Sequence, residues 1–386
     1  MEKHLESIEV ECECGKTHSL LELNILWENN DAFFQYSIVN QYTVIRLFVN
    51  ELFKDDFITL QFKDKCMQNN IKVIVSILNI NHAEIIKAND IDFLNEDYII
   101  ALGSADFIDV VKYYAGSVGV PFSIILTHDF LDYTFSKYAR LYDGLSFSFY
   151  DCEAPEFVLC YKKFFEHIDI LKLKNYLLCK KLALFENILC ENIEDKKYCK
   201  KINIRLKKII SKSKSIINIS SLIREFVFLG RSMSFFSCSK WFFGAELDLA
   251  GMIEVKTHQK FIDCYLFSGE VITSIYEKAL YSSLSIFNLN LNKRLNKIKQ
   301  ILNVSATKCL TFLKKPKSLE QLSKNINIVM ALKYMFLSML DDMTYKNSFK
   351  ISSYNLSCCI YTSPEFSIRY TFLNFLRDLG YLENIV

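Results

Sequence analysis

The chain has 386 residues, 51% of them hydrophobic, and a formal net charge of +2. This length is sufficient for two domains, and the apolar content is sufficient for a large core in each. The nearly neutral charge argues against a dedicated nucleic-acid-binding protein, because such proteins usually carry a basic excess. No stretch of about 18 apolar residues is free of charge, so we expect no membrane span.

The N-terminal residues and the cysteines indicate a cytoplasmic protein. The first residues, Met1–Glu6, lack the apolar core of a signal peptide. The 13 cysteines are an odd number without the spacing of a disulfide framework, so we expect reduced and mostly buried thiols. Cys12, Cys14 and His18 raise the question of a zinc half-site, but one residue between the cysteines is not the zinc-ribbon spacing, and no second ligand pair lies nearby.

Residues 71–126 predict a parallel sheet. Ile71–Ile77, Asp97–Leu102 and Pro121–Leu126 are short runs of apolar and β-branched residues, typical of buried strands. Between the last two, Phe107–Ser117 has the apolar spacing of a helix. A strand, a helix and a strand of these lengths form a βαβ unit.

The turn after the second of these strands is a candidate nucleotide site. Gly103 and Ser104 open the helix there, where a glycine lets the backbone approach a pyrophosphate and the helix N-terminus faces its negative charge. Asp106 would repel a phosphate, although it is also a good helix N-cap. Two interpretations therefore remain, a nucleotide-binding turn and a capped βα turn without a nucleotide.

Beyond Pro155 the pattern changes from strands to helices. Helical apolar spacing runs through Phe157–Ile193, Leu206–Phe228, Ile272–Leu284 and Ile326–Leu340. We therefore predict a Rossmann-like α/β domain over residues 1–153 and an all-helical domain over residues 154–386.

A basic stretch interrupts the helical half. Lys196–Lys214 contains nine Lys or Arg residues with Ile and Leu between them. It is either an amphipathic segment that docks on anionic lipid or, as is more usual, the solvated face of a helix.

Two motifs in the second half carry a family resemblance. Ser239–Leu247 reads S-K-W-F-F-G-A-E-L, and Phe267–Glu270 reads F-S-G-E. They resemble S-R-P-A-S-G-A-E-H and H-G-E of the sn-glycerol-1-phosphate dehydrogenases, which belong to the iron-containing alcohol dehydrogenase and dehydroquinate synthase superfamily. Eight of the ten glycines stand where that family has glycine. The ending Arg369–Gly380 is also similar, and in the family the C-x-C-G-x-x-H motif lies in an N-terminal β-hairpin without a metal.

The resemblance implies a dehydroquinate synthase-like fold and NAD(P)H-dependent reduction of dihydroxyacetone phosphate to sn-glycerol-1-phosphate, a step of phospholipid biosynthesis. It implies Lys112 and Asp132 as substrate contacts and Asp132 as a metal ligand. Leu247 and Ser268 occupy the positions of the two other ligands, both histidine in the family. The implied cofactor-binding residues are Gly103, Ser104, Asp109, Thr127 and Ser136.

Several departures from the family pattern bear on cofactor and substrate. Ala101 and Ala105 replace glycines of the nucleotide turn, so we expect weak NAD or NADP binding. Leucine cannot bind metal and serine is a poor ligand, so we expect no catalytic zinc. Bulky Trp241, Phe242 and Phe243 stand where the family has small residues before its glycine, and they would fill a cleft for a phosphorylated triose. A second interpretation of Asp132 is that it caps a helix running through residues 138–142.

Three hypotheses follow for the function. The protein is a true dehydrogenase with unusual ligands, a divergent enzyme that acts on another substrate without the metal, or a pseudoenzyme that keeps the fold for binding or assembly. A small phosphorylated substrate is expected only if the protein is active. A homo-oligomer is compatible with all three hypotheses.

Overall fold

The computed structural model describes residues 8–11, 17–20, 23–28, 31–80, 82–127, 130–166, 168–190, 204, 206–211, 218–235, 242–281, 326–341, 351–365, 371–378 and 382. The chain divides into two compact units. The first comprises Met1–Ile170 and Ile217–Ser239, and the second comprises Leu171–Ile216 and Lys240–Val386.

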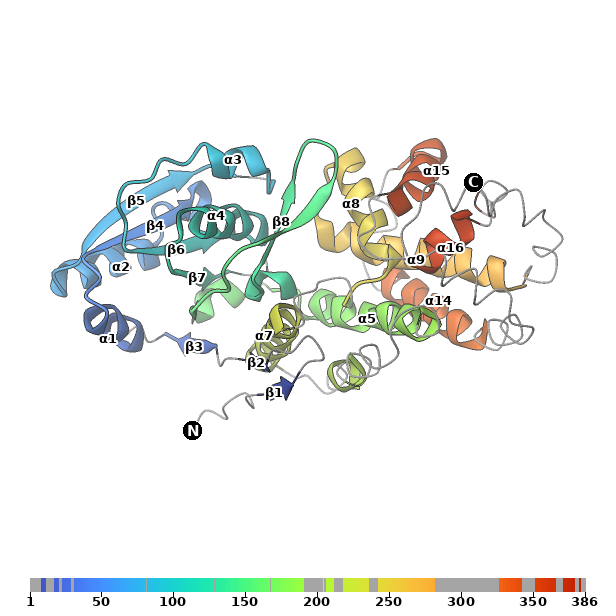
Figure 1. Ribbon diagram of the computed structural model, residues 1–386, viewed down its shortest axis with the longest axis horizontal. Coiled ribbons are helices and arrows are strands. Elements are labelled where there is room, and N and C mark those ends of the chain that lie inside the picture. The colour runs from blue at the N-terminus through green and yellow to red at the C-terminus, as the bar shows by residue number, and fades with distance from the viewer. Residues whose placement is uncertain are drawn as a thin grey trace. The chain divides into compact units, whose positions relative to one another are not determined.

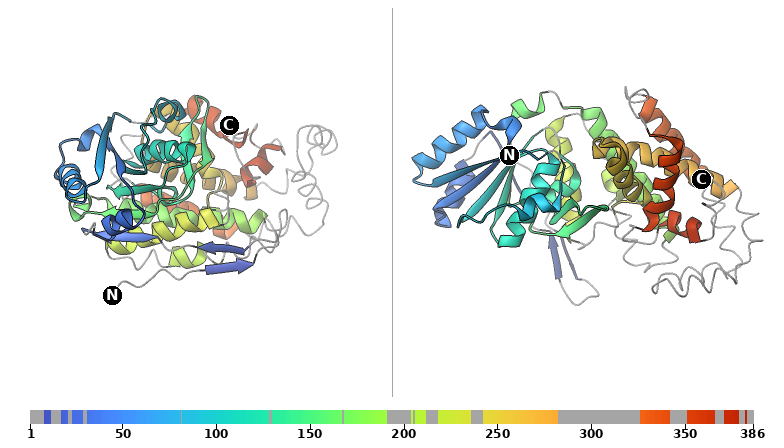
Figure 2. Two further views of the ribbon diagram at one scale, coloured as in Figure 1. Left: turned by 60° about the vertical axis from the view of Figure 1, so that its left-hand side comes forward. Right: turned by 90° about the horizontal axis from the view of Figure 1, so that it is seen from above.

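The first unit contains a parallel sheet of six strands, visible in Figure 1 and in the right-hand view of Figure 2. Its strand order is β3-β10-β7-β6-β4-β5, and all neighbours are parallel. The strands are β3 (Asn24–Trp27), β4 (Val44–Asn50), β5 (Lys72–Leu78), β6 (Tyr98–Gly103), β7 (Phe122–Leu126) and β10 (Phe157–Cys160). The predicted βαβ unit is confirmed, with α4 (Ala105–Val118) as its helix.

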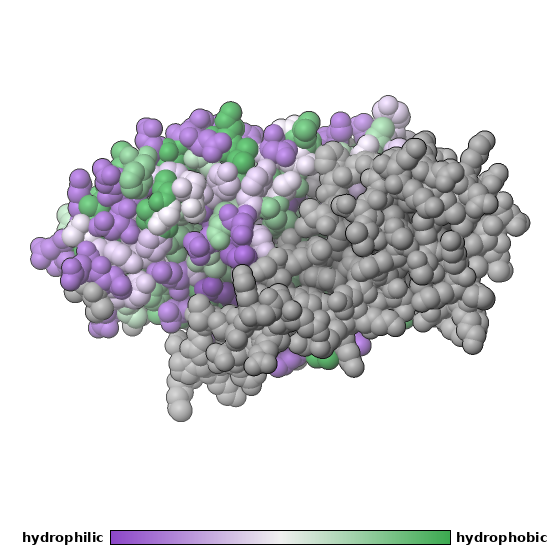
Figure 3. Space-filling model, viewed as in Figure 1, coloured by the Kyte–Doolittle hydropathy of each residue, from purple (hydrophilic) through white to green (hydrophobic). Residues whose placement is uncertain are grey.

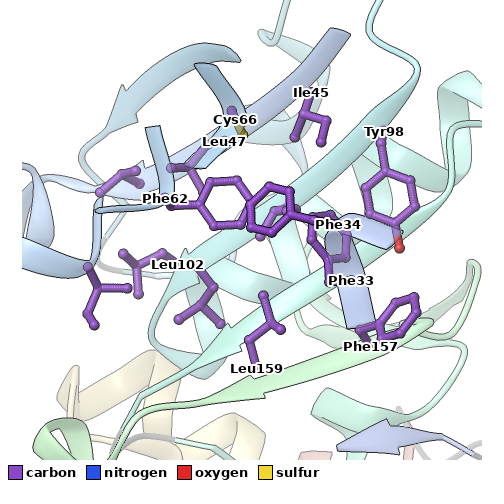
Figure 4. Close-up of a cluster of buried hydrophobic side chains, with 14 of the residues drawn as sticks. Phe33, Phe34, Ile45, Leu47, Phe62, Cys66, Tyr98, Leu102, Phe157 and Leu159 are labelled. Carbon is purple, nitrogen blue, oxygen red and sulfur yellow. The ribbon is translucent and has the colours of Figure 1, made fainter. Parts of the chain in front are cut away.

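Successive side chains along each strand point to opposite faces of the sheet, and both faces are apolar. Helices therefore cover both faces. On one face, α1 (Asp31–Val39) and α2 (Phe57–Gln68) bury an aromatic cluster with the strands (Figure 4). Phe33 lies at its centre, 5.8 Å from the ring of Phe62 and 5.7 Å from that of Phe157. The other face carries α4 and the short helix α3 (Ile85–Asn89), and Tyr114 of α4 packs on Phe48 of β4.

Two hairpins and three 3-10 helices complete the strand-rich part. The hairpins are β1 (Ile8–Glu11) with β2 (Thr17–Leu20) and β8 (Tyr138–Tyr142) with β9 (Phe147–Asp151). The 3-10 helices are η1 (Glu51–Phe53), η2 (Asp132–Phe135) and η3 (Lys162–Phe165). The first hairpin agrees with the resemblance, whereas Cys12 and Cys14 lie outside the described residues.

Three expectations for this unit are corrected. Residues 138–142 form strand β8 instead of a helix, because they pair with β9. Residues 157–160 form β10 in the sheet, so strands continue beyond Pro155. The first unit also includes α7 (Ile219–Phe235), whose Arg231 Nη2 donates to the carbonyl oxygen of Pro155 at 2.6 Å. For these reasons the units do not divide at residue 153.

The described part of the second unit is helical. It contains α5 (Ile170–Cys190), α8 (Ala245–Thr257), α9 (Phe261–Tyr281), α14 (Ile326–Asp341), α15 (Ser353–Thr362), η5 (Ser363–Glu365) and α16 (Phe372–Asp378). Helix α9 packs against both α8 and α14. The predicted helices within residues 157–193, 272–284 and 326–340 correspond to α5, α9 and α14, whereas most of the basic stretch lies outside the described residues. None of the helices that the structure describes is long and apolar enough to cross a membrane.

Candidate functional site

The strand order creates a topological switch point in the first unit. From β4 the chain passes outward to β5, and then returns to the other side of β4 as β6. The connections that leave the carboxyl ends of β4 and β6 therefore run in opposite directions. Ligands of open parallel sheets bind at such a point, beyond the carboxyl ends of the strands. Asn50 ends β4 here and Gly103 ends β6.

The predicted nucleotide turn lies at this switch point. Ser104 is the N-cap of α4, and its side chain accepts a hydrogen bond from the Phe107 N–H at 3.4 Å. Asp106 lies in the first turn of the helix and is not its N-cap. This corrects the expectation that Asp106 caps the turn. A Cβ atom at Gly103 would lie only 2.5 Å from the Phe107 ring. The glycine is therefore required by packing, whether or not a nucleotide binds.

Asp109 and Lys112 form a buried ion pair. The Lys112 Nζ lies 3.1 Å from Asp109 Oδ1 and donates to the carbonyl oxygens of Tyr133 and Tyr138, each at 2.9 Å. Asp109 Oδ2 accepts from the Arg140 N–H at 3.1 Å. Burial raises the pKa of Asp109, against the opposing effect of Lys112. The ammonium has three N–H donors, and these contacts use all of them, so none is left for a substrate.

The implied cofactor contacts Thr127 and Ser136 also bond within the fold. Thr127 Oγ1 donates to the carbonyl oxygen of Gly103 at 2.8 Å and so joins the ends of β7 and β6. Ser136 Oγ donates to the carbonyl oxygen of Tyr133 at 2.8 Å and accepts from the Tyr138 N–H at 3.0 Å. Both hydroxyls are fully buried and fix the segment on which Asp132 lies.

Asp132 begins η2 and is fully buried. Its Oδ1 accepts a hydrogen bond from the Tyr133 N–H at 3.0 Å. Helix α7 approaches so closely that a Cβ atom at Gly230 would lie 2.2 Å from the carbonyl oxygen of Asp132. Because residues 138–142 form strand β8, Asp132 does not cap a helix there. Its neighbour in the motif, His128, lies outside the described residues.

The other two positions that the resemblance implies as metal ligands lie in the second unit. Leu247 is in the first turn of α8, and Ser268 lies in the middle of α9, which packs against α8. Both side chains are buried, and the Ser268 Oγ has no hydrogen-bond partner among the described residues. The described residues also contain no cluster of three or more His, Cys, Asp or Glu that could hold a metal. A side chain without a donor atom and a neutral hydroxyl do not fit a zinc site.

The aromatic residues before Gly244 belong to the core of the second unit. Phe242 and Phe243 are fully buried, and Phe243 meets the ring of Tyr265 edge-on at 5.9 Å. The Lys180 ammonium lies 3.3 Å from the centroid of the Phe243 ring, where a cation is favourable. Trp241 lies outside the described residues.

The sequence did not predict a buried pair of carboxylates beside Leu247. Glu246 Oε1 accepts from the Gly244 N–H and the Tyr265 hydroxyl, each at 2.8 Å. Glu186 of α5 accepts from the Ala245 N–H at 3.2 Å and from the Tyr276 hydroxyl. Burial, and then the charge of Glu186, raise the pKa of Glu246.

This pair holds the turn before α8 against α5 and α9. One feature of the sequence could have indicated this pair. Glu186 lies alone among the mostly apolar residues Leu182–Leu189, and such a position suggests a buried charge that needs partners.

No protein-family model matches the sequence, and neither does any curated protein. Solved structures do match. An iron-containing alcohol dehydrogenase from Thermotoga maritima aligns with a TM-score of 0.54 at 11% identity, over 93% of this chain and 98% of that one. The chain has the fold of the iron-containing alcohol dehydrogenases.

Two further structures give the same fold. NADH-dependent butanol dehydrogenase A from Thermotoga maritima aligns with a TM-score of 0.55 at 8% identity, over 92% of this chain and 89% of that one. Aldehyde reductase YqhD from E. coli aligns with a TM-score of 0.52 at 10% identity, over 92% and 97% of the two chains. The dehydroquinate synthase-like architecture expected from the sequence is thereby confirmed.

Proposed function

We propose that this protein is a divergent member of the glycerol-1-phosphate dehydrogenase family that has lost metal-dependent reduction of dihydroxyacetone phosphate. The observation that carries this proposal is the pair Leu247 and Ser268 at two of the three ligand positions. In the family the metal is a Lewis acid that polarises the substrate carbonyl. This chemistry needs about three protein ligands, and the chain supplies only Asp132.

Nicotinamide nucleotides remain the cofactor class that the first unit would accept. One similar structure is, by its name, NADH-dependent, and the switch point with Gly103 and Ser104 is the place for a pyrophosphate. Asp106 in the first turn of α4 opposes a phosphate there. We infer that NAD or NADP binds weakly.

The retained switch point favours a second candidate function. A metal-independent NAD(P)-dependent oxidoreductase acting on another substrate would need this nucleotide site and no zinc ligands. A pseudoenzyme acting in binding or assembly would need neither. The metal-independent enzyme and the pseudoenzyme therefore predict different nucleotide affinities, and both predict that no zinc is bound.

The test uses the full-length protein purified without chelator. Metal content is measured first, then NADH and NADPH affinity by calorimetry, and then reduction of dihydroxyacetone phosphate. We expect no stoichiometric zinc and no turnover. Micromolar nucleotide affinity without zinc would favour the metal-independent enzyme. Roughly one zinc per chain, lost in Asp132→Asn and accompanied by turnover, would overturn the proposal.

A further inference from the structure

A cavity in the first unit lies beside β5, and none of the residues of the nucleotide turn, Gly103–Asp106, lines it. It has a volume of about 300 Å³ and is bounded by the end of β5, by α3 and by the residues that follow α3. Leu78, Ile91 and Leu94 form part of its apolar lining. Apolar side chains reach the surface around β5 and α3 (Figure 3), including Ile77 and Ile86. The cavity is large enough for a small metabolite with an apolar portion.

A buried arginine on β4 contributes to the lining. Arg46 is 6% exposed, and its guanidinium lies 4.4 Å from the centroid of the Phe48 ring. Nε donates to Ser76 Oγ at 2.9 Å, and Nη1 donates to the carbonyl oxygen of Asp92 and, at 3.2 Å, to the Tyr114 hydroxyl. Nη1 also forms a buried ion pair with Glu96 Oε1 at 3.2 Å.

These contacts fix the guanidinium plane and leave one nitrogen available. Nη2 makes no hydrogen bond to the residues that the structure describes, so its two N–H donors can serve a ligand.

Charges of both signs surround the same cavity. Lys87 lies in the last turn of α3, and Asp90 and Asp92 follow it. All three side chains are exposed, and within the described part of the chain none of them forms an ion pair. The ammonium of Lys87 and the carboxylates of Asp90 and Asp92 therefore line one cavity without pairing with each other.

We propose that this cavity binds a small zwitterion, with a carboxylate or phosphate monoester on Arg46 and Lys87 and an ammonium group on Asp90 and Asp92. A simple anion would meet the carboxylates of Asp90 and Asp92, and a simple cation would meet the ammonium of Lys87 and the guanidinium of Arg46, which is already paired with Glu96. A ligand that carries both charges satisfies both sets, and its apolar portion contacts Leu78. This site is separate from the nucleotide turn and independent of any redox activity.

The test is calorimetric titration of the full-length protein with two zwitterions, L-leucine and phosphoethanolamine, which distinguish an amino acid from a phosphorylated headgroup. Acetate, inorganic phosphate and ethanolamine serve as single-charge probes. We expect one zwitterion to bind with a submillimolar Kd and each single-charge probe to bind at least about tenfold more weakly. If neither zwitterion binds below about 10 mM, or if the single-charge probes bind equally well, the proposal is wrong.

Variants then locate the site. Lys87→Ala and Asp90→Asn should each weaken the zwitterion about tenfold, because each removes one charge-assisted hydrogen bond. Lys54→Ala and Asp55→Asn remove exposed charges from residues outside the cavity lining and should leave the affinity unchanged. Leu94→Trp, at a rim position that is 45% exposed, should fill the cavity and abolish binding without lowering the melting temperature. Binding that survives Leu94→Trp, or that the control variants weaken equally, would place the ligand elsewhere and overturn the proposal.

Discussion

The ammonium of Lys112 lies 3.1 Å from the carboxylate of Asp109, and both side chains are fully buried. Both residues match the family pattern, where they imply ligand contacts. Here they connect α4 to the backbone around Asp132, since Lys112 also donates to the Tyr133 carbonyl. We propose that Asp109 and Lys112 are positioning residues for that segment.

Lys112→Met should lower the free energy of unfolding by about 3–5 kcal/mol, because it leaves the Asp109 charge buried without its partner. Urea denaturation measures this loss, and Lys54→Met, at an exposed lysine, is the matched control. The double variant Asp109→Leu/Lys112→Met should lose less than the sum of the single losses. A loss below about 1 kcal/mol for Lys112→Met would contradict the positioning role.

Gly103→Ala should destabilise the protein even without a nucleotide, because the new methyl group would meet the Phe107 ring at 2.5 Å. Overpacking of this kind typically costs about 1–3 kcal/mol. Adding Phe107→Leu should recover part of the loss in thermal denaturation. If Gly103→Ala leaves the melting temperature unchanged, the glycine is not retained for packing.

Ser268→Ala should stabilise the protein or leave it unchanged, since it removes a buried hydroxyl that has no partner among the described residues. The control is Thr273→Ala in the same helix, which removes a buried hydroxyl that does have a partner. Thr273 Oγ1 donates to the Gly269 carbonyl oxygen at 2.9 Å, and its removal should cost about 1 kcal/mol. Equal losses in the two variants would show that the Ser268 hydroxyl has a partner.

Glu246→Gln should flatten the dependence of stability on pH. Burial and the neighbouring Glu186 raise the pKa of Glu246 above its usual 4.5, so the folded state holds the proton more tightly than the unfolded chain. This stabilisation is complete below the unfolded pKa and is lost as the pH rises through the raised folded pKa.

Melting temperatures from about pH 5 to 8 measure the effect, with Glu51→Gln, at an exposed glutamate, as the control. The melting temperature of the unaltered protein should fall more with rising pH than that of Glu246→Gln. Parallel curves would mean that Glu246 does not titrate in this range.

Replacing Leu247 and Ser268 together with histidine should restore zinc binding more than turnover. Zinc affinity depends on the number of ligands, and the resemblance supplies Asp132 as the third. Turnover also needs the nucleotide turn, where Asp106 still opposes a phosphate. Elemental analysis and an NADH assay with dihydroxyacetone phosphate separate the two effects. A folded double variant without zinc would show that these positions do not form one site, and ready turnover would show that the turn is not limiting.

The fold was predictable where one signal dominated. The β-branched runs that became β5, β6 and β7 and the helical spacing that became α4 have a single interpretation at short range. Residues 138–142 were misread because their pairing with β9 is a tertiary contact that helical spacing does not report. The functions of Asp109, Thr127 and Glu246 were beyond the sequence for the same reason. Each of them has a hydrogen-bond partner distant in the sequence, namely Arg140, Gly103 and Tyr265, between 19 and 31 residues away.

Arg231 of α7 donates a hydrogen bond to the Pro155 carbonyl, so the first unit is incomplete until α7 has been synthesised. The first unit takes its last helix, α7, from residues that follow the 171–216 segment of the second unit. A nascent chain that ends at residue 170 has no α7 to pack against η2, so the sheet-containing unit is completed only after about 70 more residues have left the ribosome. A fragment cut at residue 170 would therefore expose the apolar surface that α7 covers.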